Sequence, residues 1–478
     1  MQQEVRALAS CSRWGARVAR VAVLLCVTVF GVGQAGDTKA SDALELTLED
    51  AVGFALARNR GFLKRREDRA VQQLNLEIAE DRWAPRVSLS SNARRDRDAS
   101  GGTGGAGMTI MVPATGGRLA LNWDESLSDS SGDTRSRSLG FTQPLLKGGP
   151  ASADHAIRRA RLGEQGNILG LRGAAAALIS ETIGQYRALI RAARQVEIAE
   201  TALRRAQEQL ARTRALIEVG RVARREAVRS EATIANRELA LVTARNALDT
   251  ANLALVDHLA FEEAVRIRPL ASLTVERREV DHASVLADAL RLRPDYRQAQ
   301  LNVETARIAL EAARNNLLPD LSLQFNMSRT DHRQADMGAG IDRSVMLNAT
   351  IPLNDRQAEV ALVGARLGLR QAERDLTGLR ASIDIAVRRA VTDVTVNLRR
   401  TDLAREARAL AESNLEIEKG KFNEGLASSA EVATAEDNLV QAEEAEVNAI
   451  NTYLAALTQL DQVSGRTLAR WDVELETP

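Results

Sequence analysis

Four scattered histidines are the side chains best suited to acid–base chemistry or metal binding in this chain of 478 residues. They are His155, His258, His282 and His332. None has a second histidine or a carboxylate at the spacing that a metal site requires. No nucleophile elbow, HExxH segment or dinucleotide-binding fingerprint occurs in the sequence. We therefore expect these histidines on helix faces or on the surface, and we predict no catalytic residue, no cofactor, no metal and no enzymatic activity.

The two cysteines, Cys11 and Cys26, both lie in residues 1–35, which have the pattern of a secretory signal peptide. Arginines precede an apolar run at 21–32 that is shorter than the ~20 residues of a membrane-spanning helix, and small residues precede a cleavage site after residue 35. A retained anchor is the alternative. Lipid attachment at Cys11 is disfavoured, because its lipid-attachment box precedes the apolar run instead of following it. The mature chain would then contain no thiol, disulfide or thiolate metal site.

Charge and glycine content argue against nucleic acid and phosphate ligands. The chain has 64 basic and 64 acidic residues, and removal of 1–35 leaves 60 and 63, so no nucleic-acid partner is implied. The glycine cluster at 101–107, GGTGGAG, lacks the Gly-Lys-Ser/Thr that follows in a phosphate-binding loop. We predict that 101–107 and the SDSSGD segment at 128–133 are flexible, exposed loops.

The chain is a tandem duplication. A helical pattern stops at Pro319 and an alternating pattern follows it, and a shift of 234 positions superposes the same switch at Pro85. We predict a first repeat at 36–268, a linker at 269–284, a second repeat at 285–466 and a C-terminal tail at 467–478. After Pro319, the apolar residues fall on one face of a strand and the polar residues on the other. The predicted lipid-facing residues are Leu321, Leu323, Phe325 and Met327.

The returning strands of the two halves match at an offset of 208, with Pro144 over Pro352. We predict a β-hairpin at 320–353 and an enlarged one at 86–144 that is 26 residues longer, the excess being the two loops. Together they would supply about four strands per chain. The four prolines Pro85, Pro144, Pro319 and Pro352 would mark the breaks between helix and strand, because proline disfavours a continuing helix.

Long helical hairpins follow each β-hairpin. No proline falls between Pro150 and Pro269 or between Pro352 and Pro478, and apolar residues recur there in steps of three and four. We predict helices over 155–218 and 356–422, rods of roughly 95 Å. Gly220 and Gly425 would end them and start returning helices, giving hairpins at 155–263 and 356–466. The predicted fold class is mainly α-helical with a membrane β-region.

Four strands cannot close a membrane barrel, since the smallest single-chain barrels use about eight, so we expect several copies to share one barrel. The hairpin turns lie at the far end of the rods from the strands. We predict that they dock a partner through small or apolar exposed residues. These residues are Val219, Gly220, Arg221 and Val222 in one tip, and Gly425, Leu426, Ala427 and Ser428 in the other.

Between about Leu46 and Gly465, the chain resembles the TolC-like outer membrane efflux proteins. The resemblance lies in the duplicated opening (ALARN at 55–59, ALRLRP at 289–294), the helix-to-strand prolines, the QPLLKGG and IPLND strand exits, and the glycines of VGRVA and EGLAS. It implies a homotrimer in the outer membrane with a twelve-stranded β-barrel and an α-helical tunnel across the periplasm. This duct would meet a periplasmic adaptor bound to an inner-membrane pump, in a tripartite efflux pump or a type I secretion system. Departures from the family are the enlarged first hairpin, the missing glycine pair of IPLND, and Arg60 and Gly61 in the usual proline region.

An elongated periplasmic coiled-coil adaptor or scaffold protein is the alternative function. It would explain the helical hairpins. It would not explain two proline-bounded pairs of strands with alternating apolar faces.

Overall fold

The computed structural model of the chain describes residues 44–95, 100–113, 115–128, 133–149, 154–263, 265–270, 274–332 and 340–473. Almost all of them belong to one compact unit, Glu45–Pro478. The predicted signal peptide at 1–35, with both cysteines, lies outside the described residues. Within these ranges, no helix combines the length and the apolar character needed to cross a bilayer.

The first half is built around one long helix, α5 (His155–Glu218). Helices α2 (Leu48–Arg58) and α3 (Arg60–Glu80) precede the strands of this half, and α6 (Arg225–His258) returns along α5 after the turn. Helices α2, α3 and α6 all pack against α5. The 64 residues of α5 run without a break, as expected for a stretch free of proline.

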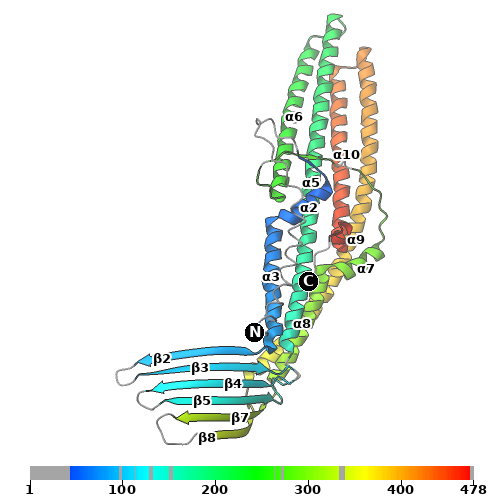
Figure 1. The fold of residues 1–478 in the computed structure, drawn as a ribbon. Helices are drawn as coiled ribbons and strands as arrows, with labels where there is room; N and C mark the ends of the chain where they lie inside the picture. Colours follow the sequence, from blue (N-terminus) through cyan, green and yellow to red (C-terminus); the bar gives the residue numbers. More distant parts are fainter. Residues whose placement is uncertain are drawn as a thin grey trace, which may run out of the picture. The chain divides into compact units, whose positions relative to one another are not determined.

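The second half repeats this plan. Its elements are α7 (His282–Leu292), α8 (Pro294–Asn316), the 68-residue helix α9 (Arg356–Asn423), α10 (Ser429–Ser464) and the short α11 (Thr467–Arg470). Helices α7, α8 and α10 pack against α9, and α5 contacts both α8 and α10. Figure 1 shows the two hairpins, α5–α6 and α9–α10, running side by side.

The larger sheet contains six antiparallel strands within the described residues. They are β2 (Arg86–Arg95), β3 (Ser100–Met111), β4 (Arg118–Ser128), β5 (Thr134–Pro144), β7 (Asp320–His332) and β8 (Gly340–Thr350), in the spatial order β2-β3-β4-β5-β7-β8 (Figure 1). The pairing of β5 with β7 joins the two halves of the chain, with Phe141 opposite Phe325. A separate two-stranded sheet pairs β1 (Leu44–Leu46) with β6 (Ile267–Pro269).

The expectation of about four strands, with a flexible glycine loop at 101–107, is therefore wrong. That segment lies inside β3, which is paired with β2 on one side and β4 on the other. Part of the 128–133 segment lies outside the described residues. Glycine has a low strand propensity, but here it leaves room for its neighbours, since a Cβ at Gly105 would require the side chain of Asp124 to move. The first half therefore contributes two consecutive hairpins instead of one enlarged hairpin.

Two buried apolar clusters pack short elements, α7 and the segment after α11, against the long helices. Ile383 and Val387 of α9 and Tyr453 of α10 belong to a buried cluster completed by α7. Ile179 of α5 belongs to a second cluster, against which Trp471 packs just after α11. The described part of the predicted C-terminal tail is thus packed on the helices through α11.

Candidate functional site

The two hairpin tips have the same backbone design. Gly220 follows α5 with a φ of 74° and Gly425 follows α9 with a φ of 78°, the left-handed conformation that glycine adopts at least cost. The amide of Arg221 donates to the carbonyl of Leu216 at 2.9 Å, and the amide of Leu426 donates to the carbonyl of Lys421 at 2.8 Å. These bonds across five residues, with shorter ones from each glycine, are the Schellman ending of a helix.

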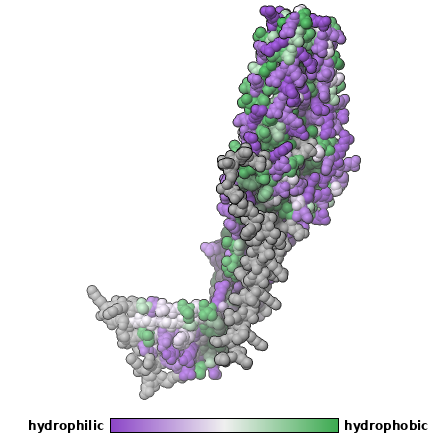
Figure 2. Space-filling model, turned by 45° about the horizontal axis from the view of Figure 1, so that its top comes forward, coloured by the Kyte–Doolittle hydropathy of each residue, from purple (hydrophilic) through white to green (hydrophobic). Residues whose placement is uncertain are grey.

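The exposed apolar residues of the tips are Val219 and Leu426. Their exposed fractions are 69% and 75%, and in the two equivalent turns Val219 directly precedes Gly220 whereas Leu426 directly follows Gly425. Exposed apolar side chains at the ends of long polar rods are candidates for a contact surface. Figure 2 shows that most of the surrounding surface of the helical hairpins is hydrophilic, with apolar residues scattered among polar ones.

Three predicted docking residues have mainly structural contacts. Val222 and Ala427 are partly buried, and they pack on a core in which Phe422 is only 1% exposed. The expectation that both are exposed is therefore wrong, because the two tips pack on each other and partly cover these side chains. Ser428 is the N-cap of α10: its hydroxyl accepts from the amide of Glu431, whose carboxylate accepts from the amide of Ser428.

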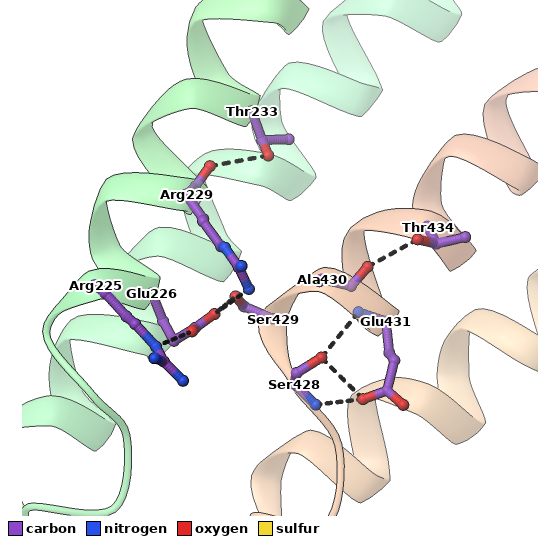
Figure 3. Close-up of polar contacts among 9 residues, drawn as sticks. All are labelled: Arg225, Glu226, Arg229, Thr233, Ser428, Ser429, Ala430, Glu431 and Thr434. Carbon is purple, nitrogen blue, oxygen red and sulfur yellow. Dashed lines mark hydrogen bonds and ion pairs between the residues drawn. The ribbon is translucent and has the colours of Figure 1, made fainter.

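A polar contact joins the two tips through Glu226, near the start of α6, and Ser429, the first residue of α10 (Figure 3). The hydroxyl of Ser429 donates to Oε2 of Glu226, which is 8% exposed. Two arginines approach the same carboxylate, Arg225 at 3.4 Å and Arg229 at 3.6 Å. The bond from Ser429 holds the pKa of Glu226 below its ordinary value, and the arginines lower it further. Glu226 is therefore ionised at neutral pH and accepts a charge-assisted bond.

A row of charged side chains continues this contact along the hairpins. Arg237 of α6 pairs with Asp437 of α10, and Arg205 of α5 pairs with Glu443 of α10 at 3.0 Å. Glu436 of α10 interacts electrostatically with both arginines; it is 4% exposed, and one of its buried carboxylate oxygens has no hydrogen-bond partner. Burial raises the pKa of Glu436, although Lys419 and both arginines oppose this effect. The interface between the hairpins therefore contains one poorly solvated carboxylate.

The predicted lipid-facing residues share one face of β7. Leu323 and Phe325 are exposed, whereas Ser322 on the other face is buried and Gln324 is half-buried. Leu321 and Met327 lie on the same face as Leu323 and Phe325 by the period of two, and both are half-buried.

The four prolines lie at the ends of elements. Pro85 and Pro319 directly precede β2 and β7, Pro144 is the last residue of β5, and Pro352 follows β8 by two residues.

The histidines do not form a site. His155 lies 3.5 Å from Glu311, His258 lies 2.9 Å from the hydroxyl of Thr182, and His282 lies 3.2 Å from Asp384. These contacts are in different places, and the side chain of His332 lies outside the described part of the structure. Among the described residues, no three His, Cys, Asp or Glu side chains gather as a metal ion would require.

The contact between Glu226 and Ser429 was not predicted from the sequence. One signal was available, because the duplication aligns Glu226 with Glu431, and Glu431 with Ser428 forms a readable capping box. Only the packing of the two tips shows that Glu226 does not cap its own helix in this way and instead binds the other hairpin.

Duplicated helical hairpins attached to an antiparallel sheet with one apolar face define a channel type of architecture, without an enzyme-like site in the described residues.

The model of the family "Outer membrane efflux protein" matches residues 52–260 and 285–466. The chain is 26% identical over 360 residues to Protein CyaE of Bordetella pertussis, covering 73% of this chain and 69% of CyaE. It is also 26% identical over 234 residues to the outer membrane protein TolC of Salmonella enteritidis, 45% of each chain.

Solved structures agree on the fold. The outer membrane channel CmeC of Campylobacter jejuni superposes with a TM-score of 0.67 at 16% identity, covering 91% of this chain and 93% of CmeC. The chain belongs to the outer membrane efflux protein family. The resemblance to TolC-like proteins and the predicted fold class are thereby confirmed, apart from the number of strands. The protein is an outer-membrane efflux or secretion duct that extends into the periplasm, and its family and fold are those of channels, not of enzymes.

Proposed function

We propose that this protein is the exit duct of a tripartite efflux pump or type I secretion system. Three copies form the duct, which an inner-membrane transporter reaches through a periplasmic adaptor docked on the hairpin tips. The observation that carries this proposal is the pair of equivalent tips, each with an exposed apolar residue next to a glycine cap, Val219 beside Gly220 and Leu426 beside Gly425.

The length of the helices supports the docking role. A helix of 64 residues spans roughly 96 Å, so Val219 lies about that far along α5 from the end of the strands. An inner-membrane partner of an outer-membrane duct therefore meets the tips first. An adaptor helix can pack against the exposed apolar residue of each tip, Val219 or Leu426, in the manner of a coiled coil.

The open sheet supports the assembly of several copies. Among the described residues, no strand pairs with the outer edge of β2 or of β8. Backbone groups left unpaired in lipid cost several kcal/mol each, so the edges must be covered by other copies. A symmetric ring of identical chains covers every edge with one kind of contact.

The same proposal includes the domain organisation. It assigns 1–35 to a signal peptide, 36–268 and 285–466 to the two repeats, 269–284 to a linker and 467–478 to a tail. The two segments matched by the family model fall within the two repeats, which supports this division. The adaptor alternative loses support, since the family is one of outer-membrane proteins.

The test is the variant Leu426→Glu, with Leu426→Met as its matched control. We expect Leu426→Glu to abolish export by the native host, measured both as dye efflux and as protein secretion, and to abolish crosslinking to the adaptor, while the trimer remains in the outer membrane. Gly425→Asp should act in the same way, because it places a charge and a strained side chain at the tip. Leu426→Met keeps an apolar side chain and should keep function. Normal efflux and normal secretion with Leu426→Glu, or loss of its trimer, would show that the coupling site lies elsewhere.

A further inference from the structure

We propose that three copies of this chain close an eighteen-stranded barrel, in which β8 of each copy pairs with β2 of the next. The resemblance to TolC-like proteins implies twelve strands, four from each of three copies. This chain instead brings six strands to one sheet within the part that the structure describes. The inference rests on the proposed homotrimer and concerns the width and lining of its outer-membrane pore.

The first argument is strand length. A tilted strand crosses a bilayer in about 9–11 residues. The six strands contain between 10 residues in β2 and 13 in β7, so each is long enough to cross. Strands β3 and β4 are the additional pair, and their 12 and 11 residues fall within this range.

The second argument is a continuous apolar band across the sheet. The pairing register places Met108 of β3 beside Leu121 of β4, then Leu139 of β5 and Met327 of β7, and this apolar row ends at Arg343 of β8. The next row on the same face consists of apolar residues on five neighbouring strands. They are Ile110, Leu119, Phe141, Phe325 and Val345. Strands β3 and β4 therefore share the lipid-facing band of β7 and β8 at the same depth.

The outer boundary of this band lies at one level on β4, β5 and β7. One row further toward the outer loops, Trp123 of β4 lies opposite Arg137 of β5, and Arg137 lies opposite Arg329 of β7. Aromatic and charged residues at one level mark the membrane–water interface of outer-membrane barrels. Strand β4 thus leaves the apolar band at the same level as β5 and β7.

The third argument is the other face, which is lined by small polar residues. In β3 this face carries Gly105 and Gly107. Side chains from both neighbouring strands approach them, with Ser88 Oγ at 3.0 Å and Asn122 Oδ1 at 3.1 Å from the place where a Cβ of Gly107 would be. At the level of Gly105 and Gly107 this face of β3 carries no side chain that would narrow the lumen. Barrels of 16–18 strands leave an aqueous channel.

Strand direction permits the closure. The six strands alternate in direction, so β2 leaves the helical region and β8 returns to it. Placing β8 of one copy beside β2 of the next makes an antiparallel pair, as in every other pairing of the sheet. Since barrel diameter grows roughly linearly with strand number, the backbone diameter would be about 1.5 times that of a twelve-stranded barrel.

Electron cryomicroscopy of the full-length protein in lipid nanodiscs tests this directly. We expect a threefold particle with eighteen strands in the barrel wall. A threefold particle with twelve strands, and β3 and β4 outside the wall, would overturn the inference and leave the proposed trimeric duct intact. A closed barrel made from two copies would overturn both.

Bimane labelling at single cysteines gives an independent test, since the sequence contains no cysteine beyond Cys26. Met108→Cys and Met327→Cys lie in one row of the apolar face, and Thr109→Cys and Asn326→Cys are their neighbours on the polar face. Brominated lipid should quench the first two labels at least twofold more than the second two. Quenching at Met327 but not at Met108 would place β3 outside the barrel and refute the inference alone. Absence of quenching at both would also refute the proposed membrane duct.

Discussion

Loss of the Ser429 hydroxyl should loosen the contact between the two hairpin tips. In Ser429→Ala, the buried carboxylate of Glu226 loses its hydrogen bond from the other hairpin and keeps only the arginines of its own helix, at 3.4 and 3.6 Å. Hydrogen bonds to charged groups contribute about 1.5–3 kcal/mol. Since 1.4 kcal/mol is a factor of ten, local opening of the tips should become roughly 10–100 times more frequent.

Hydrogen exchange of the purified protein at neutral pH measures this opening. We expect faster exchange of the amides at 222–230 of the first hairpin and at 429–436 of the second. Ser428→Ala is the matched control, because it removes the cap of α10 without touching Glu226. The control should accelerate exchange in the second hairpin alone.

The pH dependence follows from the depressed pKa of Glu226. A carboxylate whose pKa is lowered by folding contributes stability above its ordinary value of 4.5, and this contribution disappears as the pH falls through the lowered pKa. The difference between wild type and Ser429→Ala should therefore be complete at neutral pH and vanish in strong acid. Equal exchange of wild type and Ser429→Ala at 222–230, or an equal effect of Ser428→Ala there, would refute the reasoning.

Three further predictions concern the caps, the membrane face and the buried carboxylate. Gly220→Ala and Gly425→Ala should each destabilise the tips by about 1–2 kcal/mol, because both glycines have a positive φ. Chemical denaturation of the single and double variants measures this loss. Variants as stable as the wild type would contradict the prediction. Leu323→Arg should reduce membrane insertion by about 2–4 kcal/mol and Asn326→Arg should have a mild effect, as measured by heat-resistant trimers in outer-membrane fractions; equal loss in both would contradict the assignment of faces. Glu436→Gln should raise the melting temperature at pH 7 more than at pH 4. The pKa of Glu436 is raised by folding, so its charge destabilises the folded state as the pH rises above the ordinary value of 4.5. The same rise in melting temperature at both pH values would contradict this cause.

The extra strands show why sequence alone misjudged the sheet. Strand signals come from β-branched and aromatic residues in alternation, and 101–107 contains five glycines, one alanine and one threonine. Its extended form depends on two neighbouring strands, which supply hydrogen-bond partners along both sides of β3. That stabilisation is non-local, so no property of the segment itself reveals it.

The helical part was determined almost entirely by the sequence. Freedom from proline and a steady apolar period predicted a helix over 155–218, and α5 has the same bounds. The duplication located both glycine turns, and their positive φ values follow from the absence of a side chain at Gly220 and Gly425.

Only the tertiary structure decided how the tips are used. Periodicity places Val222 and Leu426 alike, as apolar residues beside a turn, yet one packs on the shared core of the tips and the other is 75% exposed. The bond from Ser429 to Glu226 likewise connects residues 203 positions apart. Local pattern fixed each helix because helix formation depends on neighbours in the chain. Burial, charge pairing and strand number depended on which distant segments came together.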